Sequence, residues 1–132
     1  MITIATLAKA RKQEVFDQIA THMLTQMKVC ELAENLDNAP ACVYRNSEGL
    51  KCAAGCLISD EEYNEKIGPK GLNTYGWDQL IERGIVTKRH KNIIKELQNI
   101  HDQVTENRWY YYLAGVAKKF DLNQKAIRPF KK

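Results

Sequence analysis

The sequence contains no apolar run that approaches the ~18–20 residues of a membrane-spanning helix. In residues 1–16 the charged side chains follow the short apolar part, whereas a secretory signal peptide has the opposite order. We therefore expect a cytoplasmic protein that has no membrane partner. Disulfides are rare in that reducing compartment, so we expect the four cysteines to be reduced.

Motifs that hold phosphate groups are also missing, since the chain has neither the G-x-x-x-x-G-K-[ST] loop nor the G-x-G-x-x-G fingerprint. The sequence has no internal repeat and no low-complexity segment. Its composition is ordinary for a globular protein, with 44% hydrophobic and 27% charged residues and a net charge of +4. A chain of 132 residues predicts one domain over 1–132, with residues 1–11 and 123–132 as loosely held termini.

Apolar residues recur with the helical period in three parts of the chain. Residues 12–27 carry one stripe, residues 88–104 carry a second, and residues 106–120 carry a third. His22 falls opposite the first stripe, so we expect its side chain to be exposed. His101 falls on the second stripe, which predicts that its ring faces the core.

Shorter signals complete the predicted fold. Ser59 and Glu62 match a capping box, which predicts a helix that starts at Asp60. Gly84 is a favourable C-terminal cap for a helix that includes Trp77. Strand-like residues around an Asn-Ser-Glu-Gly turn predict one β-hairpin at about residues 41–53. We therefore predict a mainly α (α+β) fold: a small helical domain of four to six helices with this hairpin.

Three cysteines, Cys42, Cys52 and Cys56, lie within fifteen residues and allow several interpretations. They could bind zinc with His101, or with Cys30 as the fourth ligand, because a Cys-x3-Cys pair falls in the range of zinc sites. A cysteine-dependent enzyme would instead use Cys52 or Cys56 as nucleophile with the candidate pair His101 and Asp102. Neighbouring residues of a helix point about 100° apart, which argues against that pair. The simplest interpretation is that the cysteines are small buried packing residues without a cofactor.

Binding surfaces are predicted in two regions. Loops on a rigid scaffold often carry function, and Tyr, Trp and Arg dominate interface energies. The candidate binding residues are Tyr44, Arg45, Glu48, Lys70, Tyr75 and Trp77. Trp77 is also a strong candidate for the core. The basic C-terminal residues 118–132 allow contact with nucleic acid, although a second DNA-reading helix would be cut short by Pro129. Of the three consecutive tyrosines at 110–112, we expect two to be used in packing.

The stretch CVYRNSEGLKCAAGCLISDEEY, residues 42–63, resembles a motif of small uncharacterised proteins of tailed phages and prophages. The shared pattern is C-x-YR-x(3)-G-x-KCA-x-GCLI-x-DE-x-Y, and Leu97-Gln98 and His101-Asp102 match a later part of it. The resemblance implies the cytoplasm of an infected host cell. It also implies an accessory protein that acts by binding and inhibits or modulates a host or defence-system macromolecule, with a host or phage protein as the expected partner. Two alternatives remain: a cysteine-dependent or zinc-dependent enzyme, and a nucleic-acid-binding protein.

Overall fold

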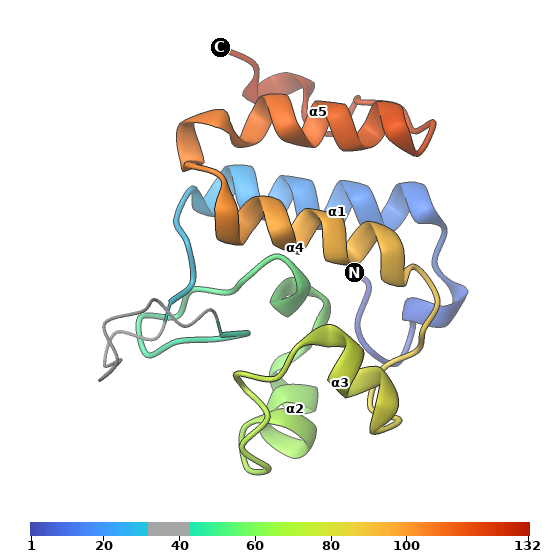
Figure 1. Cartoon of the computed structure of the whole chain (residues 1–132), viewed down its shortest axis with the longest axis vertical. Helices are drawn as coiled ribbons and strands as arrows, with labels where there is room; N and C mark the ends of the chain where they lie inside the picture. Colours follow the sequence, from blue (N-terminus) through green and yellow to red (C-terminus); the bar gives the residue numbers. More distant parts are fainter. Residues whose placement is uncertain (32–42) are drawn as a thin grey trace.

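The computed structural model describes residues 1–31 and 43–132, and these residues are mainly helical. Three longer helices form the body of the molecule: α1 (Lys12–Gln26), α4 (Lys91–Gln103) and α5 (Trp109–Lys119). Figure 1 shows α1 and α4 side by side with α5 packed on them, while α2 and α3 lie at the opposite end of the molecule. No helix among the described residues combines the length and the apolar character that a bilayer span requires.

The predicted apolar stripes build the core between the three helices. α1 buries Val15, Phe16, Ile19, Ala20, Met23 and Leu24, and α5 buries Trp109, Leu113, Val116 and Ala117. α4 buries Ile93, Ile94, Leu97, Ile100 and His101, which confirms the predicted inward face of this helix. Because each stripe follows the helical period, local sequence alone determines which face of each helix is buried.

The predicted capping box is confirmed. Ser59 Oγ accepts a hydrogen bond from Glu62 N at 3.1 Å, and the Ser59 N–H donates to Glu62 Oε1 at 2.9 Å. Helix α2 (Asp60–Glu62) starts as predicted at Asp60 and continues into a π-helical turn, η3 (Tyr63–Ile67). This cap fixes the chain direction directly after the cysteine-rich segment.

The helix predicted before Gly84 is also present. Helix α3 (Trp77–Glu82) follows Gly76, and Gly84 has a φ of +72°. A φ in that region favours glycine, and the Ile85 N–H closes the helix end on Leu80 O at 3.0 Å. Short 3-10 turns connect the rest: η1 (Leu7–Lys9), η2 (Ala54–Leu57), η4 (Glu106–Arg108) and η5 (Arg128–Phe130).

The predicted β-hairpin is wrong for the described residues. An isolated antiparallel bridge joins Arg45 to Lys51, and the described residues contain no strand. Side chains of α1 bind the backbone of Lys51: Gln26 Oε1 accepts from Lys51 N at 3.1 Å, and Gln26 Nε2 donates to Lys51 O at 2.8 Å. Because helix side chains satisfy these groups, a strand partner is not needed. The chain then turns into η2.

His22 takes part in the same contact, so its predicted exposure is wrong. Its Nε2 lies 3.0 Å from Lys51 O, and the ring is half-buried. Since a carbonyl oxygen only accepts hydrogen bonds, Nε2 must carry the proton. The terminal segments are likewise packed on the helices: Gln18 binds Ile2 N at 2.7 Å and Ile2 O at 2.9 Å, and Ile127 is fully buried.

Candidate functional site

A hydrogen-bond network surrounds His101, which is 1% exposed. The Cys30 N–H donates to His101 Nε2 at 3.1 Å, so Nε2 carries a lone pair and the ring is neutral. His101 Nδ1 lies 2.9 Å from Asp102 Oδ1 and therefore donates to it. Gln98 Nε2 donates to the same oxygen at 2.8 Å, while Gln98 Oε1 accepts from Ala54 N at 2.9 Å. The network thus joins three separate parts of the chain.

The helix-geometry argument against the pair of His101 and Asp102 is wrong for their side chains, which are in contact. The two Cα–Cβ directions do diverge on α4, but the aspartate side chain curls back and reaches Nδ1. His101 is also stacked on Trp109, with ring centroids 5.6 Å apart. A general base needs its lone pair facing a substrate, and here the lone pair is occupied by a backbone amide. The pair therefore serves the fold in this geometry.

The cysteines of the described residues are buried or partly buried thiols. Burial raises the pKa of Cys30 to about 11 and that of Cys56 to about 12. Burial also raises the pKa of Cys52 well above its usual range. A nucleophilic cysteine needs a lowered pKa, so these environments oppose thiolate chemistry. Cys30, Cys52 and Cys56 form no disulfide.

Zinc coordination receives no support from the described residues, in which no three His, Cys, Asp or Glu side chains are grouped as ligands. Cys56 Sγ donates to Ala53 O at 3.2 Å, Cys52 Sγ accepts from Gly55 N at 3.2 Å, and both ring nitrogens of His101 are in use. Cys42 lies outside the described residues, so its role as a ligand stays a prediction.

Several predicted binding residues are used inside the fold. Tyr44 and Trp77 are only 5% and 6% exposed, and they pack edge to face with centroids 6.2 Å apart. Arg45 forms an ion pair with Asp60 and donates to Ile58 O at 2.6 Å. Its guanidinium also lies 4.9 Å from the Tyr63 ring centroid, so it holds α2 in place. These contacts make the three side chains structural.

The other predicted binding residues lie nearer to solvent. Glu48 and Lys70 are exposed, and Tyr75 is half-buried with Arg83 4.9 Å from its ring. Tyr44, Tyr75 and Trp77 line one small cavity of about 190 Å³ together with Cys52 and Asp102. The structure therefore brings together residues from both the predicted binding set and the predicted catalytic set.

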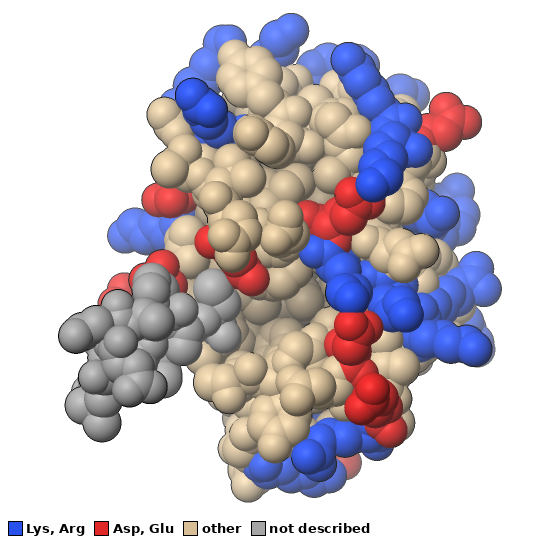
Figure 2. All heavy atoms as spheres, in the orientation of Figure 1, with Lys and Arg blue, Asp and Glu red and all other residues tan. Residues whose placement is uncertain are grey.

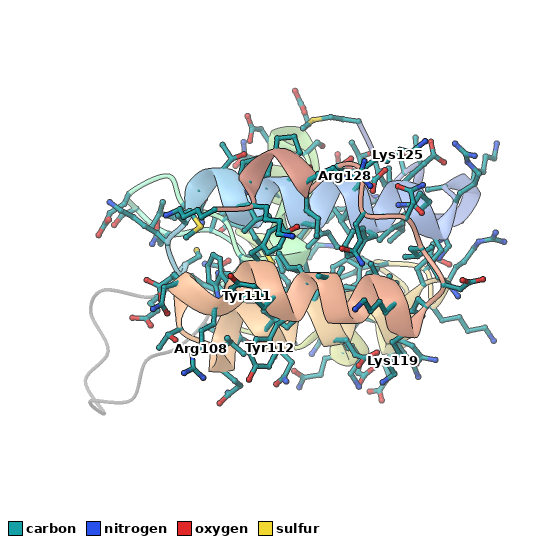
Figure 3. The ribbon with its side chains drawn as sticks, turned by 90° about the horizontal axis from the view of Figure 1, so that it is seen from above. Arg108, Tyr111, Tyr112, Lys119, Lys125 and Arg128 are labelled. Atoms are coloured by element: carbon teal, nitrogen blue, oxygen red, sulfur yellow. The ribbon has the colours of Figure 1, made fainter. Side chains whose placement is uncertain are left out.

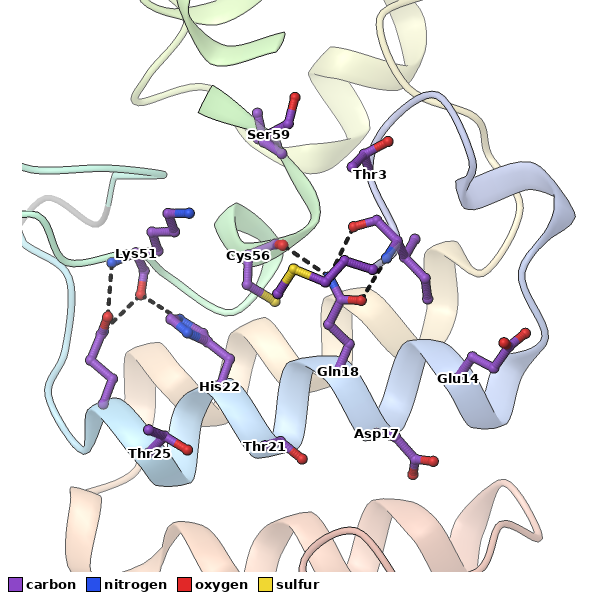
Figure 4. A pocket seen from close by; sticks show the side chains of 14 residues that line it. Thr3, Glu14, Asp17, Gln18, Thr21, His22, Thr25, Lys51, Cys56 and Ser59 are labelled. Carbon is purple, nitrogen blue, oxygen red and sulfur yellow. Dashed lines mark hydrogen bonds between the residues drawn. The ribbon is translucent and has the colours of Figure 1, made fainter. Parts of the chain in front are cut away.

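A larger groove of about 870 Å³ runs along α1, opposite residues 51–59 (Figure 4). Gln18 crosses its floor and donates to Ile2 O at 2.9 Å and to Cys56 O at 3.1 Å. His22 and Cys56 both line the groove, but His22 binds Lys51 O and the Cys56 thiol binds Ala53 O. Its polar side chains mainly tie segments together, and the described residues that line it include no nucleophile hydrogen-bonded to a base.

The most accessible aromatic residues lie on α5, where Tyr111 and Tyr112 are 66% and 48% exposed. Tyr110 is the only one of the three consecutive tyrosines that is half-buried, so the expectation that two of them pack is wrong. The exposed residues at 108, 111, 112, 115, 118 and 119 recur with the helical period and define what we call the α5 surface: Arg108, Tyr111, Tyr112, Gly115, Lys118 and Lys119.

The α5 surface is hollowed on both sides of Tyr111. A depression of about 410 Å³ lies towards α4 and includes Ile100 and Gly115, where an added Cβ would meet open space. A second depression of about 680 Å³ includes Leu24, Met27 and Phe130. Figure 3 shows Arg108, Tyr112 and Lys119 along one side of α5, with Lys125 and Arg128 on the segment beside it. The periodicity of 108–119 could have revealed this surface from the sequence.

Comparisons of the chain with protein-family models, with curated proteins and with solved structures found no match. The functional conclusion therefore depends on the residues and their geometry.

Proposed function

We propose that the protein is a phage or prophage accessory protein that binds a protein of the host cell through the α5 surface and thereby inhibits or modulates it. The observation that carries this proposal is the exposure of Tyr111 and Tyr112 at the centre of a basic helix face. Tyrosine and arginine are enriched among the residues that dominate protein–protein binding energies.

The charge of this region favours an acidic partner surface. Residues 105–132 hold seven of the 20 Lys and Arg residues and only two of the 16 acidic residues, so the net positive charge of the chain resides there. Figure 2 shows Lys and Arg side chains around the end of the molecule that is formed by α5 and the C-terminal segment, and further ones along one side and at the opposite end. Among the described residues, Lys119 is the one Lys or Arg of residues 105–132 that forms an ion pair, and its partner is Glu96.

A protein suits the α5 surface better than a nucleic acid does. One of the two depressions includes the apolar residues Leu24, Met27 and Phe130, which suit the side chains of a protein. After α5 the chain forms the three-residue turn η5 at Pro129, so the described residues contain no second helix that could enter a major groove.

The phage setting is supported by the sequence motif, and the structure gives its residues a common role. Arg45 binds Asp60, and the Gly55 N–H donates to the sulfur of Cys52. The first contact holds Arg45 against α2, and the second closes the turn that follows Lys51. Since the motif positions maintain this fold, a shared motif suggests a shared scaffold, whereas the α5 surface lies outside the motif.

Site-specific photo-cross-linking in host cells tests the proposal. We would replace Tyr111 with the photoreactive residue p-benzoylphenylalanine, irradiate the cells and identify the cross-linked species by mass spectrometry. Tyr111 is 66% exposed, so the bulky residue fits without disturbing the core. We expect one main protein adduct, which survives nuclease treatment and carries an acidic surface.

Lys70 provides the matched control position, because it is exposed and lies between η3 and α3, and Figure 1 shows α3 at the end of the molecule opposite α5. The same photoreactive residue at position 70 should give none of this adduct. Adducts that disappear on nuclease treatment would instead favour the nucleic-acid alternative. Identical protein adducts from positions 70 and 111 would overturn the proposal, because they would show nonspecific contact.

A further inference from the structure

The larger of the two depressions beside Tyr111, of about 680 Å³, has walls from three parts of the chain. Leu24 and Met27 lie at the end of α1, Tyr110 and Tyr111 on α5, and Phe130 in η5. Leu24 is part of the core, and Met27, Tyr110 and Phe130 are half-buried and pack against it. The depression is therefore an opening at the edge of the core, with an apolar contribution from each of its three walls.

Packing and hydrogen bonds hold these walls in place. Helix α1 packs directly on α5. The rings of Tyr110 and Tyr111 meet edge to face, with centroids 5.6 Å apart. The Phe130 N–H donates to Ile127 O at 2.9 Å, and the fully buried side chain of Ile127 anchors η5 in the core. The depression is thus preformed, so binding would not have to order its walls.

The size and the wall chemistry of the depression favour an aromatic group. Its volume lies within the roughly 300–1,000 Å³ that is usual for ligand sites, so a bulky side chain fits. Aromatic rings pack favourably against other rings, here Tyr110 and Phe130, and against a thioether sulfur, here that of Met27. An aromatic side chain also has only two torsion angles to order when it binds.

The charge around the depression favours a carboxylate close to that ring. Glu106 and Lys132 both line the depression and offset each other. Arg108 lies three residues before Tyr111 on the α5 surface (Figure 3), and residues 105–132 hold seven Lys or Arg residues and two acidic ones. This excess of positive charge would repel the same surface of a second copy of the chain, which argues against a homodimer here, and it attracts an acidic segment.

We propose that this depression receives an aromatic side chain of the partner protein, and that an Asp or Glu close to it in the partner sequence lies against the cations of the α5 surface. The inference rests on the proposed function and specifies the part of the partner that is recognised: an exposed segment in which an aromatic residue is flanked by acidic ones. Aromatic anchors that are buried in a pocket contribute a large share of the binding energy at many interfaces.

The probe is 3-phenylpropionate, an aromatic ring joined to a carboxylate, which is titrated into the intact protein at 50 mM NaCl and followed by NMR. The three methionine methyl groups report on separate places: Met27 lines the depression, Met23 is buried in the core, and Met1 lines the groove along α1. We expect a saturable shift of the Met27 signal that exceeds those of Met23 and Met1, with a Kd on the order of 1–10 mM for so small a ligand. The absence of a saturable Met27 shift would overturn the proposal, as would a larger shift at Met1.

Two matched ligands separate the ring from the charge. The amine 3-phenylpropan-1-amine keeps the ring and reverses the charge, so it should bind about threefold or more weakly than the acid. Propionate lacks the ring and should give no saturable shift. Equal affinity of the protein for the acid and the amine would contradict the role given to charge.

Variants locate the binding of the probe. Phe130→Ala removes one wall and Asn107→Trp places a bulky ring in the depression, so each should weaken binding about tenfold. Tyr112→Ala changes an exposed ring outside this depression and should leave binding unchanged. The Met23 signal shows whether the core of each variant is intact. A loss of affinity as large in Tyr112→Ala as in the other two variants would contradict the location.

The cross-link from position 111 then tests recognition of the partner. The partner peptide joined there should contain Phe, Tyr or Trp within a few residues of Asp or Glu, and a peptide without an aromatic residue would overturn the inference. A protein adduct without binding of the probe would overturn the anchor site and keep the proposed function. Binding of the probe without any protein adduct would contradict the proposed function and support the depression as a site for an aromatic acid.

Discussion

Gly55 lies so close to the backbone of Tyr44 that there is no room for a side chain at position 55. A Cβ at this position would overlap the carbonyl oxygen of Tyr44 and approach the sulfur of Cys52 within 3.3 Å. The Gly55 N–H already donates to that sulfur at 3.2 Å. The small residues of this segment are therefore required by packing, which is the simplest of the interpretations that the sequence allowed for Cys52.

Gly55→Ala should consequently destabilise the protein by about 2–3 kcal/mol, since backbone or packed core must move to admit one methyl group. Cys52→Ala should cost about 1 kcal/mol, because it removes one small buried group and its hydrogen bond. Urea denaturation followed by circular dichroism measures both. Gly115→Ala is the control: its Cβ meets open space within α5, so it should be neutral or stabilising by up to ~1 kcal/mol. Equal effects at 55 and 115 would contradict the packing argument.

His22 should make the stability sensitive to acid. Burial lowers the pKa of His22, although its hydrogen bond to Lys51 O partly opposes that shift. The folded protein thus binds the histidine proton less readily than the unfolded chain, whose histidine titrates near 6.5. The free energy of unfolding contributed by neutral His22 is therefore present above pH 6.5 and is lost as the pH falls below that value.

His22→Gln tests this dependence, because glutamine can still donate to Lys51 O but has no proton to gain. Urea denaturation between pH 7.5 and pH 5 should show a smaller loss of stability for this variant than for the parent. His90→Gln serves as the control, since His90 Nε2 is also hydrogen-bonded to a backbone oxygen, Ala10 O, at 2.7 Å. If His22→Gln retained the full acid sensitivity, another group would be responsible.

At the scale of elements, Glu62 connects α2 to the N-terminal segment. Its carboxylate accepts hydrogen bonds from Ile4 N at 3.0 Å and from Ala5 N at 2.8 Å, in addition to its bond with Ser59 N. Burial tends to raise the pKa of Glu62, but these hydrogen bonds outweigh that tendency and lower it. The cap of a short helix therefore also fixes the beginning of the chain.

Ser59→Ala and Glu62→Ala should separate these two roles. Ser59→Ala removes the acceptor for Glu62 N and should cost about 1 kcal/mol, the usual loss at an N-cap. Glu62→Ala should cost more and should speed amide hydrogen exchange at Ile4 and Ala5, which Ser59→Ala should leave protected. Exchange measured by NMR distinguishes the variants. Unchanged protection of both amides in Glu62→Ala would show that the N-terminal segment is held by other contacts.

Sequence-based predictions are accurate where a structure depends on residues close together in the chain, and they fail where it depends on distant ones. The inward faces of α1, α4 and α5 and the cap at Ser59 depend on residues within one or two helical turns, and these predictions are confirmed. The hairpin is wrong because Gln26 binds the backbone of Lys51 from 25 residues away, a contact that no local pattern encodes.

The candidate sites show the same limit. Residue type predicts Tyr44, Tyr75 and Trp77 as binding candidates, but their position beside Asp102 in one cavity depends on tertiary packing. The reach of Asp102 to His101 depends on a side-chain rotation that helix periodicity does not describe. The exposed face of α5 follows the helical period, so local sequence does encode it.

At the scale of the whole molecule, the charge distribution separates the scaffold from its proposed binding surface. Lys118 is exposed and forms no ion pair among the described residues, whereas the neighbouring Lys119 is held by Glu96 at 2.7 Å. Because Lys118 forms no ion pair with the described residues, replacing it should not reduce stability, and its charge is accessible to a partner. Lys118→Glu should therefore leave the free energy of unfolding within about 0.5 kcal/mol of the parent value.

Partner binding by the same variant should respond to salt. The partner identified by cross-linking should bind parent protein less tightly as NaCl rises from 50 to 500 mM, because screening shortens the range of charge–charge attraction. Lys118→Glu should bind more weakly at 50 mM and approach the parent at 500 mM, where its lost attraction counts for little. Tyr111→Ala should weaken binding at both concentrations, since burial of a ring is not screened. Titrations of purified proteins measure all three, with Lys70→Glu as the charge-matched control. A Lys118→Glu defect of equal size at both salt concentrations would contradict an electrostatic role for the α5 surface.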